Sequence, residues 1–230
     1  MKDSVKESTK DNMKKNMKDS VKNNSGIEKV VMVGFGGHGR SIADAVEAAG
    51  KYLIVGYTDL QENAPNNGHK YLGTDDKLEE IFASGVTKAI IGLGQIKSSD
   101  NRRRLYEKLK KIGFELPVII DKTAIISDTA YIGEGSFVGK GAIINCNASV
   151  GKMCIINSGV LCEHDVSVGD FSHVAVRATV CGAASVGMGC LIGANSTLIQ
   201  GVSVGNQTVI GAGSLVRHDV PSGQIKYGII

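Results

Sequence analysis

An unbroken six-residue repeat runs through the second half of the chain and constrains its fold more than any other feature. Counting in sixes from Ile126 to Val216 gives sixteen positions, of which fifteen hold Val, Ile or Leu and the other holds Cys162. The phase never shifts, so no loop is inserted within the run. A period of six fits neither an α-helix nor an alternating strand, but it is the signature of a parallel β-helix.

The residues between these aliphatic positions agree with a triangular coil built from three hexads. The residue after each aliphatic position is often Gly, and the residue four places after it is mostly small or short-branched. We expect the aliphatic side chains to point into a prism, the small residues to fit near its corners, and Gly to tolerate strained backbone there. The pattern predicts five coils stacked at the roughly 4.8 Å spacing of paired strands. Hexads with Gly after the aliphatic residue are typical of the left-handed form.

Composition and charge narrow the class of protein. The chain has 230 residues, enough for two modest domains, and its 30 Gly and absence of Trp suit a solenoid. No apolar run reaches membrane-spanning length and the charged N-terminus lacks a signal peptide, so we expect no membrane insertion. A net charge of +3 gives little support for nucleic-acid binding. The five Cys show no metal-ligand spacing and no pair placed for a disulfide, which predicts reduced thiols in a cytoplasmic protein.

The sequence divides into three parts. Residues 1–25 carry seven Lys, four acidic residues and almost no aliphatic residues, which predicts a disordered tail. Residues 26–120 alternate strand and helix patterns, so we expect a Rossmann-like α/β domain with a parallel sheet. Residues 121–230 then form the left-handed parallel β-helix. The expected strands of the α/β domain cover 29–33, 52–57, 88–93 and 117–120, and the expected helices cover 41–49, 75–83 and 98–111.

A glycine-rich turn follows the first expected strand. Gly34, Gly36 and Gly39 match the pattern G-x-G-x-x-G before an expected helix, and Asp59 closes the second strand, where a ribose can be held. Such a turn leaves backbone N–H groups free and lets a phosphate approach them. Three interpretations stay open: a tight turn without a ligand, a dinucleotide cofactor site, and a site for a nucleotide-linked substrate.

The segment Glu163-His164-Asp165 brings acid–base chemistry to the solenoid. His164 lies two residues past a core position, so we expect its side chain outside the prism, with Gly182 one coil above leaving space beside the ring. An imidazole is suited to accept a proton near neutral pH, and Asp165 can orient it and stabilise its charged form. His173 lies half a coil away, so only two chains packed side by side bring one His164 near the other chain's His173.

Several motifs together resemble the hexapeptide-repeat sugar acetyltransferases, and in particular the sialic acid O-acetyltransferase-like group with its nucleotide-sugar 4-amino N-acetyltransferases. The motifs are Gly36-Gly37-His38-Gly39, Leu72-Gly73-Thr74-Asp75-Asp76, Glu163-His164-Asp165 and Phe171-Ser172-His173-Val174. The resemblance implies acetyl transfer from acetyl-CoA to the amine of a UDP- or GDP-linked 4-amino-4,6-dideoxy sugar in bacterial glycan biosynthesis. It also implies a nucleotide-sugar site in the α/β domain and a homotrimer with acetyl-CoA between neighbouring prisms.

Carried over residue by residue, the resemblance assigns a role to each matching position. His164 is the expected catalytic base, and Asp165 is the acid that raises its basicity. The expected substrate-binding residues are Gly36, Gly37, His38, Thr58, Asp59 and Gly94. The expected acetyl-CoA contacts are His173, Ala194 and Ala212, the last two through backbone atoms, and no metal is required. The sequence departs from the family at Asp121-Lys122, where relatives usually have His-Pro, and at the segment 227–230, where relatives have a Gly-x-Pro-Ala-basic end.

Other functions remain open at this point. The acceptor can instead be a hydroxyl of sialic acid or of another sugar, or the chain can be a scaffold that binds a nucleotide-sugar without catalysis. A carbonic anhydrase of the γ class shares the β-helix but needs three His on zinc. The coils hold only His164 and His173, with His218 at the end. We expect direct transfer without an acetyl-enzyme, with Cys146 one coil below His164 as the candidate exception.

Overall fold

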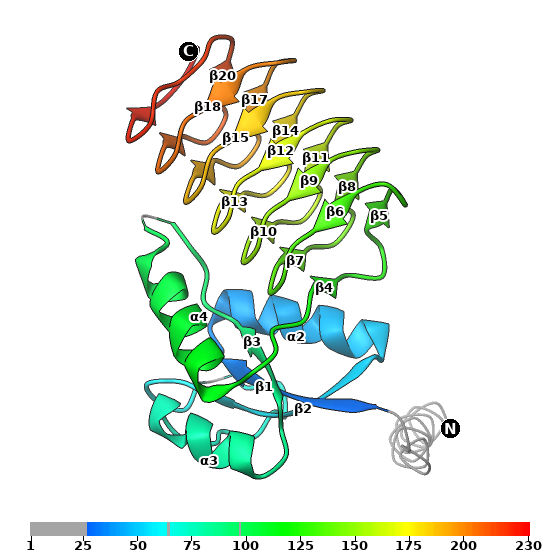
Figure 1. The fold of residues 1–230 in the computed structure, drawn as a ribbon, viewed down its shortest axis with the longest axis vertical. Coiled ribbons are helices and arrows are strands. Elements are labelled where there is room, and N and C mark those ends of the chain that lie inside the picture. The colour runs from blue at the N-terminus through cyan, green and yellow to red at the C-terminus, as the bar shows by residue number, and fades with distance from the viewer. Residues whose placement is uncertain (1–26, 64, 97) are drawn as a thin grey trace, which may run out of the picture.

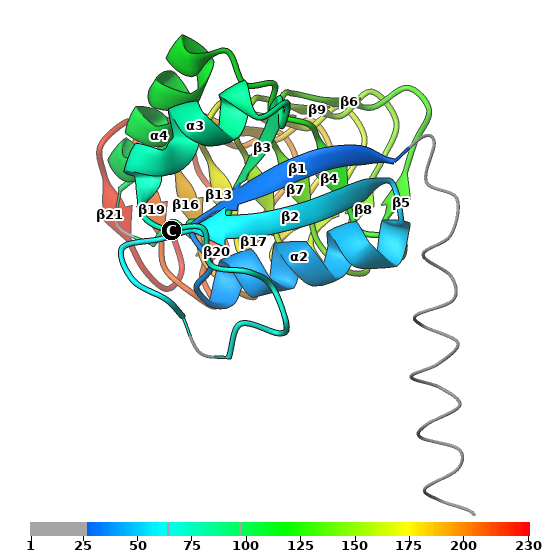
Figure 2. The ribbon, with the colours of Figure 1, turned by 90° about the horizontal axis from the view of Figure 1, so that it is seen from below.

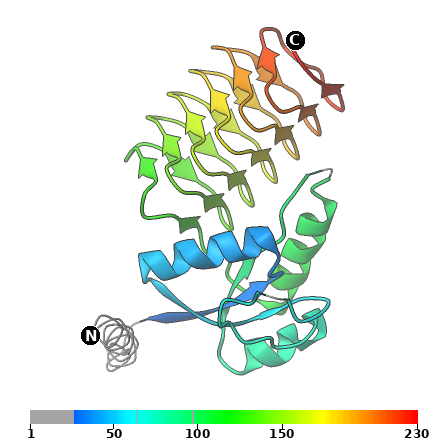
Figure 3. The same cartoon turned by 180° about the vertical axis from the view of Figure 1, so that it is seen from behind.

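The structure is a computed structural model that describes residues 27–63, 65–96 and 98–230. A small α/β domain lies under a tall solenoid, and the helix α2 (Gly37–Ala49) runs beneath the first coils (Figures 1 and 3). The tail predicted at 1–25 lies outside the described residues. Within the described part of the chain, no helix has the length and apolar character needed to cross a bilayer.

The α/β domain contains a three-stranded parallel sheet of order β2-β1-β3 between two layers of helices. Val30 and Met32 of β1 pack toward α2, while Val31 and Val33 pack toward α3 and α4, because successive side chains of a strand point to opposite faces. Figure 2 shows α2 on one side of the sheet and α3 with α4 on the other. The elements are β1 (Glu28–Val33), α2 (Gly37–Ala49), β2 (Tyr52–Thr58), η1 (Asp75–Lys77), α3 (Leu78–Ala83), β3 (Lys88–Ile91) and α4 (Asp100–Ile112).

The solenoid consists of three parallel sheets made of two-residue strands, and the predicted left-handed hexapeptide β-helix is confirmed as its fold class. The first sheet contains β4 (Ile119–Ile120), β7 (Phe137–Val138), β10 (Ile155–Ile156), β13 (His173–Val174), β16 (Leu191–Ile192), β19 (Val209–Ile210) and β21 (Ile225–Lys226). The second contains β5 (Ile125–Ile126), β8 (Ile143–Ile144), β11 (Leu161–Cys162), β14 (Thr179–Val180), β17 (Thr197–Leu198) and β20 (Leu215–Val216). The third contains β6 (Tyr131–Ile132), β9 (Ser149–Val150), β12 (Ser167–Val168), β15 (Ser185–Val186) and β18 (Ser203–Val204).

The solenoid continues beyond the regular hexads at both ends. The segment expected as a last strand leading to the solenoid contains β4, which pairs with β7 and so lies within the first sheet. At the other end, Ile210 pairs with Lys226 and Val204 bridges Val220, each sixteen residues later instead of eighteen. The last coil is therefore shortened, which explains why the six-residue phase stops at Val216. Ile230 packs against the hydrophobic core at this end.

The glycines that follow the interior aliphatic residues allow adjacent coils to approach closely, so the predicted reason for them was wrong. A β-carbon at Gly133 would lie 2.6 Å from the carbonyl carbon of Gly151 in the next coil, and neither residue has a positive φ. The left-handed backbone occurs two residues later, for example at Gly135 with φ 68° and at Asp165 with φ 60°. Gly is required at the first position by packing, while the strained position also accepts Asp, Asn and other residues.

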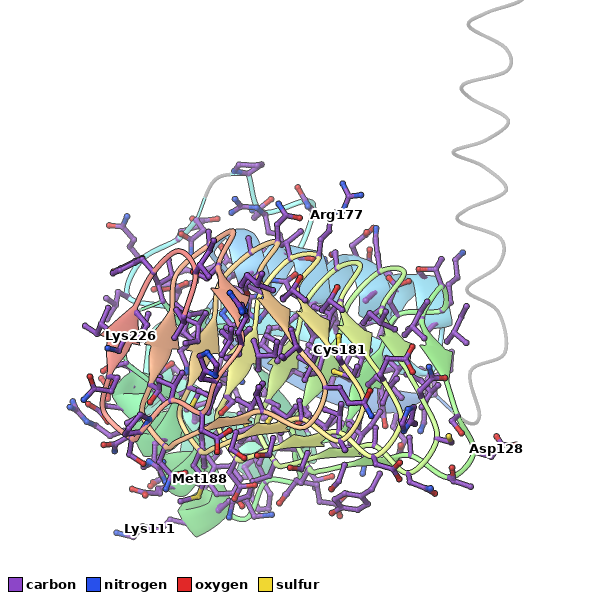
Figure 4. All side chains as sticks on the ribbon, turned by 90° about the horizontal axis from the view of Figure 1, so that it is seen from above. Lys111, Asp128, Arg177, Cys181, Met188 and Lys226 are labelled. Atoms are coloured by element: carbon purple, nitrogen blue, oxygen red, sulfur yellow. The ribbon has the colours of Figure 1, made fainter. Side chains whose placement is uncertain are left out.

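The α/β domain packs on the outer face of the first solenoid sheet. Phe137 and Ile155 join the hydrophobic core beneath α2, while Met153 and Phe171 join the core beneath α4. We call the three corners of the prism edge 1–2, edge 2–3 and edge 3–1 after the sheets that they join. Figure 4 labels a residue at each edge on a different side of the view: Arg177 on edge 1–2, Asp128 on edge 2–3 and Met188 on edge 3–1. Edge 2–3 is thus the corner opposite the sheet that carries the α/β domain.

Candidate active site

His164 and Asp165 form a hydrogen-bonded pair in the turn between β11 and β12, on edge 2–3. His164 Nδ1 lies 2.8 Å from Asp165 Oδ2, and the two side chains are 49% and 53% exposed. Asn147 Nδ2 donates to the other carboxylate oxygen of Asp165 at 3.2 Å. The hydrogen bonds from His164 and then from Asn147 lower the pKa of Asp165, so the carboxylate is ionised at neutral pH. This arrangement places the proton of the imidazole on Nδ1 and leaves Nε2 free to accept another.

Gly182 provides the space in which this imidazole lies. A β-carbon at position 182 would be 2.6 Å from both Cε1 and Nε2 of His164, well inside van der Waals contact. Gly182 does not have a positive φ, so its backbone conformation is open to any residue. The predicted open space above His164 is therefore filled by the ring of His164 itself.

A separate cleft of about 970 Å³ opens at the carboxyl ends of β1, β2 and β3. Ligands of parallel α/β sheets bind at this end of the strands. Of the residues predicted to bind substrate, Gly36, Gly37, His38, Asp59 and Gly94 line the cleft. The structure thus gathers five of the six at one place.

Two of the cleft glycines have no role in internal packing. Among the described residues, a β-carbon at Gly36 would meet no atom within 4 Å, and one at Gly37 would only reach Arg40 at 4.0 Å. Gly39 differs, because a β-carbon there would lie 2.6 Å from the carbonyl oxygen of Gly34. None of the three has a positive φ. Gly36 and Gly37 therefore leave room for a group from outside the chain.

The amino end of α2 points its backbone N–H groups at this room. Gly36 is the N-cap residue, no side chain caps the helix, and its first turn contains no acidic residue. An uncapped helix N-terminus with glycines favours an anion such as a phosphate. Arg104 of α4 is the one permanent cation among the described residues that line the cleft.

Asp59 and Thr58 organise the cleft from the end of β2. Asp59 Oδ2 accepts the N–H of Phe35 at 2.8 Å and Asn63 Nδ2 at 2.7 Å, which fixes the glycine turn from the neighbouring strand. Thr58 is fully buried and does not line the cleft. Its hydroxyl donates to Asp75 Oδ1 at 2.7 Å, so Thr58 reaches the cleft only through Asp75.

The predicted substrate residue His38 is mostly buried and uncharged. Burial, with smaller contributions from Arg102 and His173, lowers its pKa to about 3. Its ring packs edge-on against Phe137 of the solenoid, with centroids 5.6 Å apart, and its buried Nε2 has no hydrogen-bond partner among the described residues. His38 therefore lies at the junction of the two domains, at the inner wall of the cleft.

The residues expected to contact acetyl-CoA lie on the first sheet and on edge 1–2. Ala194 and Ala212 occupy equivalent turns of adjacent coils, where the N–H of Gly213 donates to the carbonyl of Ala194 at 2.8 Å. His173 lies on the face covered by the α/β domain, with both ring nitrogens in hydrogen bonds. His164 is on edge 2–3, so one chain does not bring it together with these residues.

Sequence reasoning had assigned no individual role to several cleft residues. Asp75, Asp76, Asn101 and Arg104 line the cleft, the first two before α3 and the others on α4. Asp75 and Asp76 belonged to a recognised motif, but nothing in their spacing showed that they face the glycine turn. Asn101 and Arg104 are one helical turn apart on a charged helix, a pattern that cannot be told from a solvated surface. Among the described residues, no three His, Cys, Asp or Glu side chains group as metal ligands would.

Two domain families match the chain. The PglD N-terminal domain matches residues 29–109, and the hexapeptide repeat of succinyl-transferase matches residues 183–217. The first of these matches covers the sheet and helices that form the cleft, and the second covers part of the solenoid.

Solved structures resemble nearly the whole chain. The acetyltransferase domain of PglB from Neisseria gonorrhoeae FA1090 is 28% identical over 87% of this chain and 97% of that one, with a TM-score of 0.82. It is also known in complex with acetyl coenzyme A. A mutant of GDP-perosamine N-acetyl transferase from Caulobacter crescentus, in complex with CoA and GDP-perosamine, is 27% identical over 88% of this chain and 94% of that one, with a TM-score of 0.79. WeeI from Acinetobacter baumannii AYE shares the fold at 18% identity and a TM-score of 0.55.

Both domains and their order are common to this chain and to the two acetyltransferases. The resemblance inferred from the motifs is thereby confirmed. The chain joins a domain that matches the PglD N-terminal domain to a hexapeptide-repeat solenoid, and over most of its length it is similar to these two acetyltransferases.

Proposed function

We propose that the protein transfers the acetyl group of acetyl-CoA to the amine of a nucleotide-linked amino sugar. The observation that carries this proposal is the His164–Asp165 pair, in which a hydrogen-bonded carboxylate leaves Nε2 of an exposed imidazole free to accept a proton. A scaffold that only binds a nucleotide-sugar does not require such a base. The relatives known with acetyl coenzyme A, or with CoA and GDP-perosamine, support the choice of substrates.

The mechanism is direct transfer. The sugar amine attacks the thioester carbonyl, a C–N bond forms, and His164 Nε2 takes the proton that the nitrogen loses. Asp165 stabilises the imidazolium through the Nδ1–H hydrogen bond, as the carboxylate does in a Ser-His-Asp triad. The C–S bond then breaks, and the proton passes from His164 to the departing thiolate, which yields CoA and the N-acetyl sugar.

The cleft of the α/β domain is the proposed nucleotide site. The N–H groups at the start of α2 and the side chain of Arg104 suit the diphosphate, and Gly36 and Gly37 give it room. Asp59 fixes the turn, and Gly94 lines the opposite wall beyond β3. For acetyl-CoA we propose contacts with His173 and with backbone atoms of Ala194 and Ala212.

A homotrimer completes the proposed site. The cleft and edge 1–2 adjoin the first sheet, whereas His164 lies on the opposite edge 2–3. A neighbouring prism set side by side with the first brings its His164 to them. We place this assembly in the cytoplasm, because all five cysteines are free thiols, as is usual in a reducing compartment.

Acetyl transfer is tested by following thiol release from acetyl-CoA with UDP- and GDP-linked 4-amino sugars and with matched sugars that carry a hydroxyl in place of the amine. We expect release with an amino sugar and a fall of roughly 10²–10⁴-fold in kcat for His164→Ala. Release with the hydroxyl sugars alone would move the acceptor to oxygen, and the absence of release with every sugar would favour the scaffold.

The shared site is tested by mixing two inactive variants. His164→Ala chains keep an intact cleft, and Gly37→Asp chains keep an intact His164 while placing a carboxylate where the diphosphate binds. If each site uses two chains, co-refolded mixtures regain activity, because some interfaces combine an intact cleft with an intact His164. Activity no higher than that of the separate variants would show that one chain carries the whole site.

A further inference from the structure

The loop after β3 is attached to the solenoid at two points on either side of Gly94. Arg102 of α4 donates from Nη1 to the carbonyl of Leu93 and from Nη2 to the carbonyl of Met153 at 2.9 Å. His173 of β13 donates from Nδ1 to the carbonyl of Gln95 at 2.7 Å. Gly94 lies between these carbonyls and lines the cleft. The cleft wall at Gly94 is therefore positioned by two side chains that connect it to the solenoid.

Hydrogen bonding fixes the tautomer of His173. The carbonyl of Gln95 can only accept, so the proton of the ring is on Nδ1, and Nε2 accepts from Asn157 Nδ2 at 3.2 Å. Asn157 Oδ1 in turn accepts the N–H of Ser158 at 2.8 Å, which orients the amide. The backbone N–H of His173 donates to the carbonyl of Cys190 at 2.8 Å, so the residue itself is held in the first sheet. The position and orientation of the His173 ring are therefore fixed by hydrogen bonds.

The hydrogen bond between His173 Nδ1 and the carbonyl of Gln95 is surrounded by residues that are almost fully buried. Gln95 is 3% exposed and its Nε2 contacts the carbonyl of Cys190 at 3.5 Å, while Arg102 is 1% exposed. Burial lowers the pKa of His173, so the ring is neutral, as His38 is beside it. If the carbonyl of Gln95 lost its donor, bulk water could not reach it as a replacement. The loop would have to move before this carbonyl could form another hydrogen bond.

We propose that His173 is a positioning residue of the nucleotide-sugar cleft, which it serves by holding the Gln95 carbonyl through Nδ1–H. The resemblance assigns His173 only to acetyl-CoA. The two ring nitrogens have different partners. Nδ1 holds the cleft loop through the carbonyl of Gln95, while Nε2 accepts from Asn157 of the solenoid. The proposal rests on the proposed function for the identity of the cleft's ligand, but the attachment of the loop is independent of it.

Two substitutions separate the two nitrogens. Asn at position 173 places an amide N–H where Nδ1 lies and keeps the bond to Gln95, whereas the longer Gln reaches the place of Nε2 and loses that bond. We compare His173→Asn, His173→Gln and His173→Ala in the full chain, with UDP and GDP as binding probes. Melting temperatures show whether each variant is folded, and His173→Ala replaces His173→Gln if the latter is not.

The attachment predicts a specific order of effects. His173→Gln and His173→Ala should weaken binding of the nucleoside diphosphate roughly ten-fold and increase hydrogen exchange of the amides at 93–96, while His173→Asn stays within about three-fold of the wild type in both. In turnover, the KM for the nucleotide-sugar should rise more in the first two variants than in His173→Asn. Equal exchange at 93–96 in His173→Asn and His173→Gln would overturn the proposal.

A failure of the proposed function has a different signature. If wild-type protein binds neither nucleoside diphosphate and transfers no acetyl group, the proposed substrate is wrong. The exchange comparison then still decides whether His173 positions the loop, because it requires neither ligand nor activity.

Discussion

The imidazole of His164 lies directly against the α-carbon of Gly182, one coil above it in the solenoid. A methyl group on Gly182 would be 2.6 Å from ring atoms Cε1 and Nε2. The backbone at Gly182 is not strained, so the absent side chain matters only to the ring. Because Gly182 and His164 are in contact, a substitution at Gly182 can test the catalytic role of His164 without removing its imidazole.

Gly182→Ala should displace the ring of His164 without unfolding the solenoid. The methyl group meets the outer end of a half-exposed side chain, which can rotate away, so the melting temperature should change little. We expect kcat to fall by about 10²-fold as the base leaves its position. Steady-state kinetics beside a thermal melt measure both quantities. Cys146→Ala, one coil below His164, is the control, and an inactive Cys146→Ala would instead indicate a covalent route.

Asp165→Asn should lower the rate while preserving the shape of the turn. Asn keeps the size of the side chain and tolerates the left-handed backbone at this position, but it removes the negative charge that stabilises an imidazolium. We expect kcat to fall by roughly 10- to 10³-fold, with the KM for acetyl-CoA nearly unchanged. A variant with full kcat would show that Asp165 only shapes the turn.

Gly37→Ala and Gly39→Ala should separate ligand binding from packing. Alanine at 37 meets only Arg40 at 4.0 Å and suits the first turn of a helix, so stability should hold or rise by about 0.5–1 kcal/mol while nucleoside diphosphate binding weakens. Alanine at 39 would lie 2.6 Å from the carbonyl oxygen of Gly34 and should cost about 1–3 kcal/mol of unfolding free energy. Urea denaturation and calorimetric titration measure the two effects, and equal binding losses with equal destabilisation would contradict the distinction.

Acid should destabilise the junction of the two domains through His38. Its pKa is about 3 in the folded protein, far below the ordinary 6.5, because burial disfavours the charged ring. Its contribution to stability is therefore complete above pH 6.5 and decreases as the pH falls from 6.5 toward 3. By linkage, the loss reaches roughly 2 kcal/mol at pH 5.

The measurement is the urea midpoint of unfolding between pH 7 and pH 4.5. His38→Leu removes the titrating group but keeps an apolar side chain against Phe137, so its midpoint should fall less steeply with pH than that of the wild type. His173, whose pKa is also lowered by burial, adds a loss of the same sign that remains in the variant. Parallel pH profiles for the two proteins would refute the assignment to His38.

Thr58→Val should show that Thr58 acts through Asp75. Valine matches the shape of threonine in this buried site but leaves Asp75 Oδ1 without its hydroxyl donor. We expect a loss of about 1 kcal/mol in stability and weaker nucleotide binding, because Asp75 lines the cleft. Thr58→Ser retains the hydroxyl and should restore binding. Unchanged binding in Thr58→Val would remove Asp75 from the site.

The solenoid could be predicted in detail because one local pattern, an interior aliphatic residue at every sixth position, repeats along it. Every interior position from Ile126 to Val216 recurs at six residues, and the strands lie where that phase places them. The six-residue phase did not predict the shortened last coil. There, Val220 and Lys226 pair with residues sixteen positions earlier, whereas a regular coil has eighteen. It also misattributed the glycines, because Gly133 is explained by the distance to the next coil and not by its own backbone.

The site was predicted only as separate parts. Motifs identified the glycine turn, Asp59 and the His164–Asp165 pair, each of which lies within a few residues of the strand or helix that positions it. Arg104 and the contacts of His173 were beyond prediction, because they depend on how the α/β domain packs against the solenoid. The resemblance predicted a substrate contact at Thr58, yet the hydroxyl of Thr58 donates to Asp75.

By itself, the sequence determined the period of the solenoid, the parallel sheet before it and the acid–base pair, because each follows from residues close together in the chain. Only the tertiary structure decided that His173 faces the α/β domain to hold the loop at Gln95 and that His164 lies on the edge opposite the cleft. Contacts such as that of His173 with Gln95, which are 78 positions apart, join the two domains. Their geometry is set by the packing of Phe137, Ile155 and Phe171 between two domains, which no local pattern encodes.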